Sequence, residues 1–133
     1  ARLAWPLGGL AVLVLAACPG SLDNKADFED GASVCDAPAT ILGPRCATSN
    51  CHDAEDPVSG LDLTPDPGLV ARLSGVQGRD CPDGLLVDTT TPEASLVLTK
   101  CQVDNTCNAR MPISGTKLTP SEEQCLLEWL SSL

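Results

Sequence analysis

Cysteine is the residue that most limits how this chain can fold. Eight cysteines occur among 133 residues, more than proteins of the reducing cytosol usually carry. Aromatic side chains are scarce, with two Trp, one Phe and no Tyr, and beyond residue 33 only Trp129 remains. A fold of about 100 residues would therefore lack the large flat side chains that dominate most cores. We expect disulfides, or a large buried cofactor, to complete the core.

The chain is strongly acidic. Eight Lys and Arg residues against 18 Asp and Glu residues give a formal net charge of −10. Such a surface repels nucleic-acid phosphates and anionic lipid headgroups, so we expect no nucleic-acid partner. Basic proteins are the expected partners, because opposite charges speed the encounter of two proteins. No pattern specifies an oligomeric state.

The first 33 residues predict export and anchoring. Residues 7–17 form an apolar run (LGGLAVLVLAA) that is too short for a bilayer span of about 20 residues and suits a secretory signal. The run ends in LAAC at Cys18, which resembles the lipobox of bacterial lipoproteins; a plain signal peptide is the alternative. We predict a signal peptide over residues 1–18, lipidation of Cys18 as the membrane anchor, and an outer-membrane or periplasmic lipoprotein that could face the cell surface. The acidic residues 19–33 predict a flexible tether.

Residues 34–133 are predicted to form one domain of short helices, because no segment alternates like a strand. The clearest helix is the last, where Thr119 and Glu122 form a capping box with Pro120 inside it. Its apolar face is Leu126, Trp129, Leu130 and Leu133. The other predicted helices are residues 37–46 with an interruption at Pro44, residues 66–73 ended by Gly75, and a helix that Thr91 caps before Pro92.

Two cysteines followed directly by histidine form the most informative motif. The segment Cys46-Ala47-Thr48-Ser49-Asn50-Cys51-His52 contains the only histidine of the chain. This order is typical of c-type haem attachment, in which two thiols bond the haem vinyl groups and the imidazole binds the iron. Two residues usually separate the cysteines. Here there are four, and we expect the extra residues to bulge. A backbone carbonyl near Pro57 is a candidate partner for the other nitrogen of His52.

The only methionine, Met111, lies in the sequence Arg110-Met111-Pro112. A lone methionine is often core filler, but a late methionine followed by proline is also the second iron ligand of small c-type cytochromes. A His/Met pair fills both axial positions, and thioether ligation raises the reduction potential. We predict that His52 and Met111 bind iron. Arg110 is a candidate partner for a haem propionate, and a solvated surface arginine is the favoured alternative.

The folded part resembles the cytochrome c-like domains found in secreted proteins and lipoproteins of myxobacteria and planctomycetes. The resemblance rests on four segments in the same order: residues 44–52, 60–73, 92–96 and 110–130. It implies a small all-α cytochrome c-like fold around covalent haem c, and an electron carrier rather than an enzyme. The expected haem walls are Ile41, Leu42, Leu61, Leu63, Leu69, Leu73, Leu96, Leu98, Ile113 and Leu118.

Five cysteines remain once the lipobox and the haem motif are set aside. An odd number leaves at least one thiol unpaired within the chain. We predict a disulfide between Cys107 and Cys125, because it would tie the Met111 segment to the final helix. A second disulfide would join Cys35 to Cys81 or Cys101.

Three functional hypotheses follow. The first is a membrane-tethered monohaem c-type cytochrome that carries single electrons and catalyses no reaction, since both axial positions of the iron are filled. The second is a haem-free lipoprotein of the same fold that serves as a structural or binding module. Its disulfides would include Cys46–Cys51. The third is a zinc site on Cys46, Cys51 and His52, which would need a fourth ligand.

Overall fold

The computed structural model describes residues 35–133. The predicted signal peptide, the lipidation of Cys18 and the acidic tether lie outside the described residues. Within the described part, no helix has both the length and the apolar character needed to cross a bilayer.

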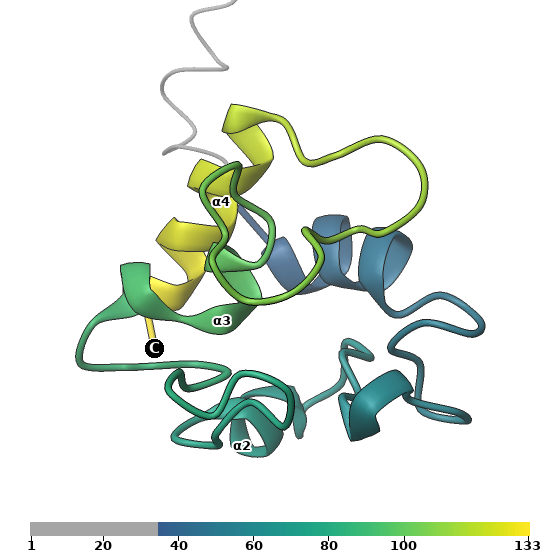
Figure 1. Ribbon diagram of the computed structural model, residues 1–133. Helices are drawn as coiled ribbons and strands as arrows, with labels where there is room; N and C mark the ends of the chain where they lie inside the picture. The colour runs from purple at the N-terminus through teal and green to yellow at the C-terminus, as the bar shows by residue number, and fades with distance from the viewer. Residues whose placement is uncertain (1–34) are drawn as a thin grey trace, which may run out of the picture. The chain divides into compact units, whose positions relative to one another are not determined.

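The described chain is helical, with 37% helix and 4% strand, so the all-α prediction is confirmed at the level of secondary structure. It contains the α-helices α2 (Leu69–Leu73), α3 (Leu96–Thr99) and α4 (Pro120–Ser131), the π-helix η1 (Pro38–Cys46), and the 3-10 turns η2 (Val58–Gly60) and η3 (Pro92–Ala94) (Figure 1). The extended contacts within residues 35–133 are two isolated bridges, Ser74–Val87 and Gln77–Leu85.

Helix α4 begins at the predicted capping box. The Thr119 side chain accepts a hydrogen bond from the Glu122 N–H, while the Glu122 carboxylate accepts one from the Thr119 N–H at 2.7 Å. Two otherwise unpaired donors of the first turn are thereby satisfied. Leu126 and Leu130 of α4 are buried, Trp129 is half-buried, and Leu133 is exposed. The predicted apolar face therefore ends one turn earlier than expected.

Helix η1 continues through Pro44, where the sequence predicted an interruption. Proline lacks an N–H and clashes with the carbonyl four residues earlier in an α-helix. The wider π-helical turn avoids this clash, and the Ala47 N–H closes it by donating to the Leu42 carbonyl at 2.7 Å. The buried side chains of η1 are Ile41 and Leu42. The helix therefore reaches Cys46 with its apolar side against the core.

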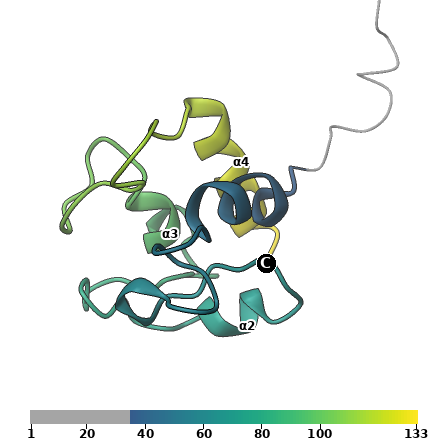
Figure 2. The ribbon, with the colours of Figure 1, turned by 90° about the vertical axis from the view of Figure 1, so that its right-hand side faces the viewer.

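The core joins the first and last helices of the described part. Figure 2 shows η1 beside α4, and a disulfide between Cys35 and Cys125 connects the start of the described chain to α4 with a Cα–Cα distance of 5.4 Å. Helix α4 also packs against α3 and η3. The buried hydrophobic residues are Ala37, Ile41, Leu42, Leu63, Leu69, Leu73, Val87, Val97, Leu98, Cys101, Leu118, Leu126 and Leu130.

The turn before α3 differs from the prediction, because Thr91 caps no helix with its side chain. Instead, the Asp88 carboxylate accepts hydrogen bonds from Thr90 and from the Thr91 N–H. Those bonds, first that of the Thr90 hydroxyl, lower the pKa of Asp88. The fully buried Ser95 hydroxyl accepts from the Asp88 N–H at 2.9 Å. Asp88, three residues before Thr91, thus orders the turn that leads into η3, and η3 itself has no side-chain cap.

The predicted Cys107–Cys125 disulfide is wrong, as is the pairing of Cys35 with Cys81 or Cys101. Cys107 bonds to Cys81, at a Cα–Cα distance of 6.0 Å, and Cys125 bonds to Cys35. The reason is spatial, because Cys107 lies against the turn that contains Asp80, whereas Cys125 lies on α4 beside the start of the fold. The Met111 segment is therefore cross-linked to the Cys81 turn and not to α4.

We expect peptide mapping of the oxidised, exported protein to recover Cys35–Cys125 and Cys81–Cys107 as the two disulfide-linked pairs. Digestion without reductant, followed by mass spectrometry, is the measurement, and a digest after reduction is the control. Closing loops of this size stabilises a fold by about 2–4 kcal/mol each, so loss of either pair should lower the unfolding midpoint. A Cys107–Cys125 peptide would contradict the structure.

Candidate functional site

The two extra residues of the cysteine motif are absorbed in a bulge. Cys46 ends η1, and the Cys51 N–H then donates to the Thr48 carbonyl at 2.9 Å. Asn50 adopts a left-handed conformation with φ 65°, which asparagine tolerates better than most residues. The His52 N–H returns to the Cys46 carbonyl at 3.1 Å. His52 therefore lies next to Cys46, as it would after a shorter loop.

The His52 ring is held in one tautomer by the backbone. Its Nδ1 lies 3.2 Å from the Leu61 carbonyl oxygen, and this oxygen can only accept a hydrogen bond, so Nδ1 carries the proton. The side chain is 9% exposed. A lone pair therefore remains on Nε2, the arrangement that metal-binding histidines show. The partner carbonyl belongs to Leu61 and not to the region of Pro57 that the sequence suggested.

Two adjoining cavities meet at His52 and Met111. The larger has a volume of about 460 Å³ and the smaller about 300 Å³, within the range of about 300–1,000 Å³ that holds drug-sized ligands and cofactors. Cys46, His52 and Met111 line both cavities, and Cys51 lines the smaller one. The structure therefore brings together all four residues that the sequence assigned to haem.

The walls of the larger cavity are mainly aliphatic. Five predicted wall residues line it, and the other five are buried in the core behind them. Val58 and Val76 line it as well. These two side chains and that of Ile113 are exposed, and Ile113 is 69% exposed. Such side chains at the mouth of a cavity are what a large apolar ligand would cover. The predicted residues that line it are Leu42, Leu61, Leu63, Leu96 and Ile113; those behind it are Ile41, Leu69, Leu73, Leu98 and Leu118.

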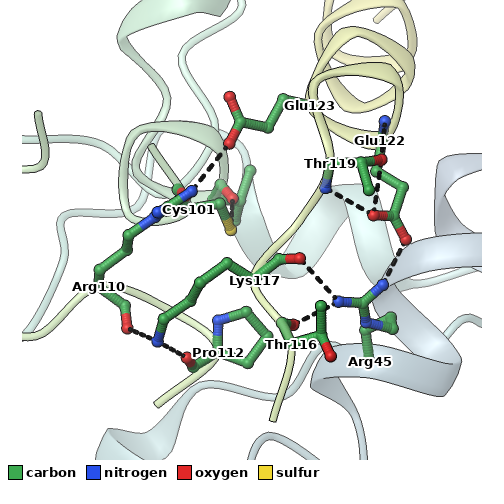
Figure 3. A network of polar contacts seen from close by, with 10 residues as sticks. Arg45, Cys101, Arg110, Pro112, Thr116, Lys117, Thr119, Glu122 and Glu123 are labelled. Carbon is green, nitrogen blue, oxygen red and sulfur yellow. Dashed lines mark hydrogen bonds and ion pairs between the residues drawn. The ribbon is translucent and has the colours of Figure 1, made fainter. Parts of the chain in front are cut away.

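Arg110 lines neither cavity and binds other parts of the chain. Its Nε donates to the Cys101 carbonyl at 2.5 Å, and its Nη2 lies 3.3 Å from a Glu123 carboxylate oxygen (Figure 3). Arg79, which the sequence did not single out, lines the larger cavity and is exposed. Within residues 35–133 its side chain makes no hydrogen bond or ion pair. No local pattern marks Arg79, because only the fold places its turn beside the cavity.

Three cysteines of the described part are free: Cys46, Cys51 and Cys101. Burial raises the pKa of Cys46 to about 11, although the neighbouring Arg45 opposes this shift. Burial likewise raises the pKa of Cys101 to about 12. The Cys46–Cys51 disulfide required by the haem-free hypothesis is thus not formed. Cys101, which the sequence offered as a candidate partner of Cys35, lines the larger cavity.

Among residues 35–133, no three or more His, Cys, Asp or Glu side chains are grouped so as to hold a metal ion. The zinc hypothesis therefore gains no support from the geometry. No family model matches the chain, and no curated protein or solved structure matches it. The chemistry of the site rests on the residues and distances given above.

Alkylation should measure the burial of the cavity thiols. Because the pKa of Cys46 is about 11 and not the ordinary 9.0, its thiolate fraction at pH 8 is roughly 100-fold smaller. A thiolate of higher pKa is more nucleophilic, which raises the alkylation rate again by about tenfold. We expect Cys46 and Cys101 to react with iodoacetamide at least about tenfold more slowly in the native haem-free protein than after unfolding in urea. Mass spectrometry of each cysteine peptide over time gives the rates. Equal native and unfolded rates would contradict the burial.

Proposed function

We propose that this protein is a monohaem c-type cytochrome of cytochrome c-like fold that carries single electrons. The observation that carries the proposal is that His52 and Met111 line the same two cavities while Cys46 and Cys51 beside them are free thiols. Histidine, methionine and two thiols are the donor set of a covalently attached haem with two axial ligands.

The residues present fit such a cofactor. Cys46 and Cys51 would form the thioether bonds, His52 Nε2 would bind the iron on one side, and the Met111 sulfur on the other. Haem c supplies one-electron chemistry at its iron. The bulge of residues 47–50 supports the proposal, because it returns His52 to the side of Cys46 despite the wider spacing.

The larger cavity would orient a bound haem and set the polarity of its surroundings. Its aliphatic walls would lower the polarity around a bound haem, which would disfavour the extra positive charge of oxidised iron and so favour the reduced form. We assign Arg79, and not Arg110, as the cation that pairs with a propionate. His52 and Met111 would together hold the iron with side chains of this chain, and we propose no enzymatic activity.

The cellular setting is part of the proposal. Lipidation of Cys18 would hold the protein at a membrane of the periplasm or outer envelope, and the residues that follow would serve as a tether. The net charge of −10 favours basic redox partners, and this attraction should weaken as salt screens it.

Covalent attachment is the direct test. We would express the chain with an export signal and with c-type maturation enzymes. The mature protein should then be heavier than its polypeptide by the mass of one haem, and it should keep its colour after denaturation. Cys46→Ala and Cys51→Ala should each lose at least one of the two bonds, and the double variant all covalent haem. Cys101→Ala is the matched control, because Cys101 lines the same cavity outside the motif. A colourless, folded wild type would contradict the proposal and favour the haem-free module.

Replacement of Met111 tests the second ligand. In the holoprotein, Met111→Ala should lower the reduction potential by a sizeable part of the roughly 0.8 V over which axial ligands set haem potentials. It should also open the iron to carbon monoxide. Spectroelectrochemistry and carbon monoxide difference spectra are the measurements. Ile113→Ala, which changes the same cavity without removing a donor, is the control. Unchanged spectra and potential in Met111→Ala would show that another residue holds this position.

A further inference from the structure

Residues 107–112 form no helix or strand, yet their carbonyl groups are held by ammonium groups. Lys100 Nζ donates to the Cys107 carbonyl and, at 2.8 Å, to the Ala109 carbonyl. Lys117 Nζ binds two further carbonyls of the same stretch. A Lys ammonium has three donors, so one side chain can hold two carbonyls at once. Asn105 also binds the Cys107 and Asn108 carbonyls at the start of this stretch. Side chains, and at its end the two lysines, therefore hold the segment in place of regular backbone pairing.

Lys117 binds the chain on both sides of Met111. Its Nζ donates to the Arg110 carbonyl at 3.2 Å and to the Pro112 carbonyl, as Figure 3 shows. The Met111 N–H itself donates to the Lys100 carbonyl at 2.7 Å. The backbone is thus fixed before, at and after Met111. Its side chain leaves the backbone in a set direction, into the lining of the two cavities.

Lys117 is itself tied to the helix that ends at Cys46. Arg45 Nη2 donates to the Thr116 carbonyl at 2.5 Å and to the Lys117 carbonyl at 3.3 Å. Arg45 Nη1 forms an ion pair with Glu122 of α4. A continuous series of hydrogen bonds therefore runs from the residue before Cys46 to the carbonyls that flank Met111.

We propose that Lys117 is a positioning residue, whose ammonium holds Met111 in the lining of the cavities that it shares with His52 before any cofactor is bound. That Met111 would bind a haem iron rests on the proposed function. The hydrogen bonds that restrain its backbone are present in the haem-free chain. The role requires both a charge and at least two donors, so arginine should replace lysine in part and methionine should not.

The first experiment uses the haem-free full chain. Lys117→Met should speed hydrogen exchange at the Met111 amide about tenfold or more, because hydrogen bonds from a charged donor are lost. Lys117→Arg should speed it less. Lys25→Met is the charge-matched control. Ile41→Val is a stability control, because it loses one core methylene outside the cavity lining. If Lys117→Met leaves the exchange rate unchanged, or changes it no more than Ile41→Val does, the proposal is overturned.

The second experiment uses the holoprotein and separates the two proposals. Lys117→Met should weaken the sulfur-to-iron charge-transfer band and lower the reduction potential, while haem remains covalently attached at Cys46 and Cys51. Lys117→Arg should restore part of the band. An unchanged band and potential would overturn the positioning role. Absence of haem from the wild type would instead overturn the proposed function and leave the exchange result to decide on Lys117 alone.

Discussion

The site depends on the position of Arg45 between three parts of the chain. This side chain, on the last turn of η1, pairs with Glu122 on α4 and donates to the carbonyls of Thr116 and Lys117. Glu122 in turn completes the cap of α4, and its hydrogen bond from the Thr119 N–H is the main cause of its lowered pKa. Because the guanidinium offers five donors in a fixed plane, one residue fixes the relative placement of η1, the ligand segment and α4.

The parts of the fold that the sequence predicted are those encoded locally. The cap at Thr119 and the return of His52 to Cys46 each depend on residues a few positions apart, so composition and spacing are enough to predict them. The continuation of η1 through Pro44 was missed because it needs a wider turn that the surrounding packing stabilises. Thr91 was misassigned because its N–H is bound by Asp88 in the turn before η3, while its side chain caps nothing.

The parts that were missed depend on contacts between distant segments. Cys107 pairs with Cys81 because the chain brings the turn at Asp80 to it, and no spacing rule reveals such a meeting. Arg110 seemed available for a propionate until the structure placed Glu123 beside it. The grouping of Cys46, Cys51, His52 and Met111 around the cavities was predictable, because the single His and the single Met stand in a recognised order with two cysteines. Lys117 and Arg79 carry no such mark.

Both proposed iron ligands are held by hydrogen bonds to main-chain carbonyls, and this bears on electron transfer. His52 is set by the Leu61 carbonyl, and Met111 lies between carbonyls held by Lys117. Backbone dipoles fixed by folding do not reorient when a charge at the metal changes. A centre that must gain and lose one electron needs ligands that stay in place in both states. A chain with few aromatic side chains of its own can thus supply rigid surroundings, and the proposed haem would supply the flat, conjugated part of the core.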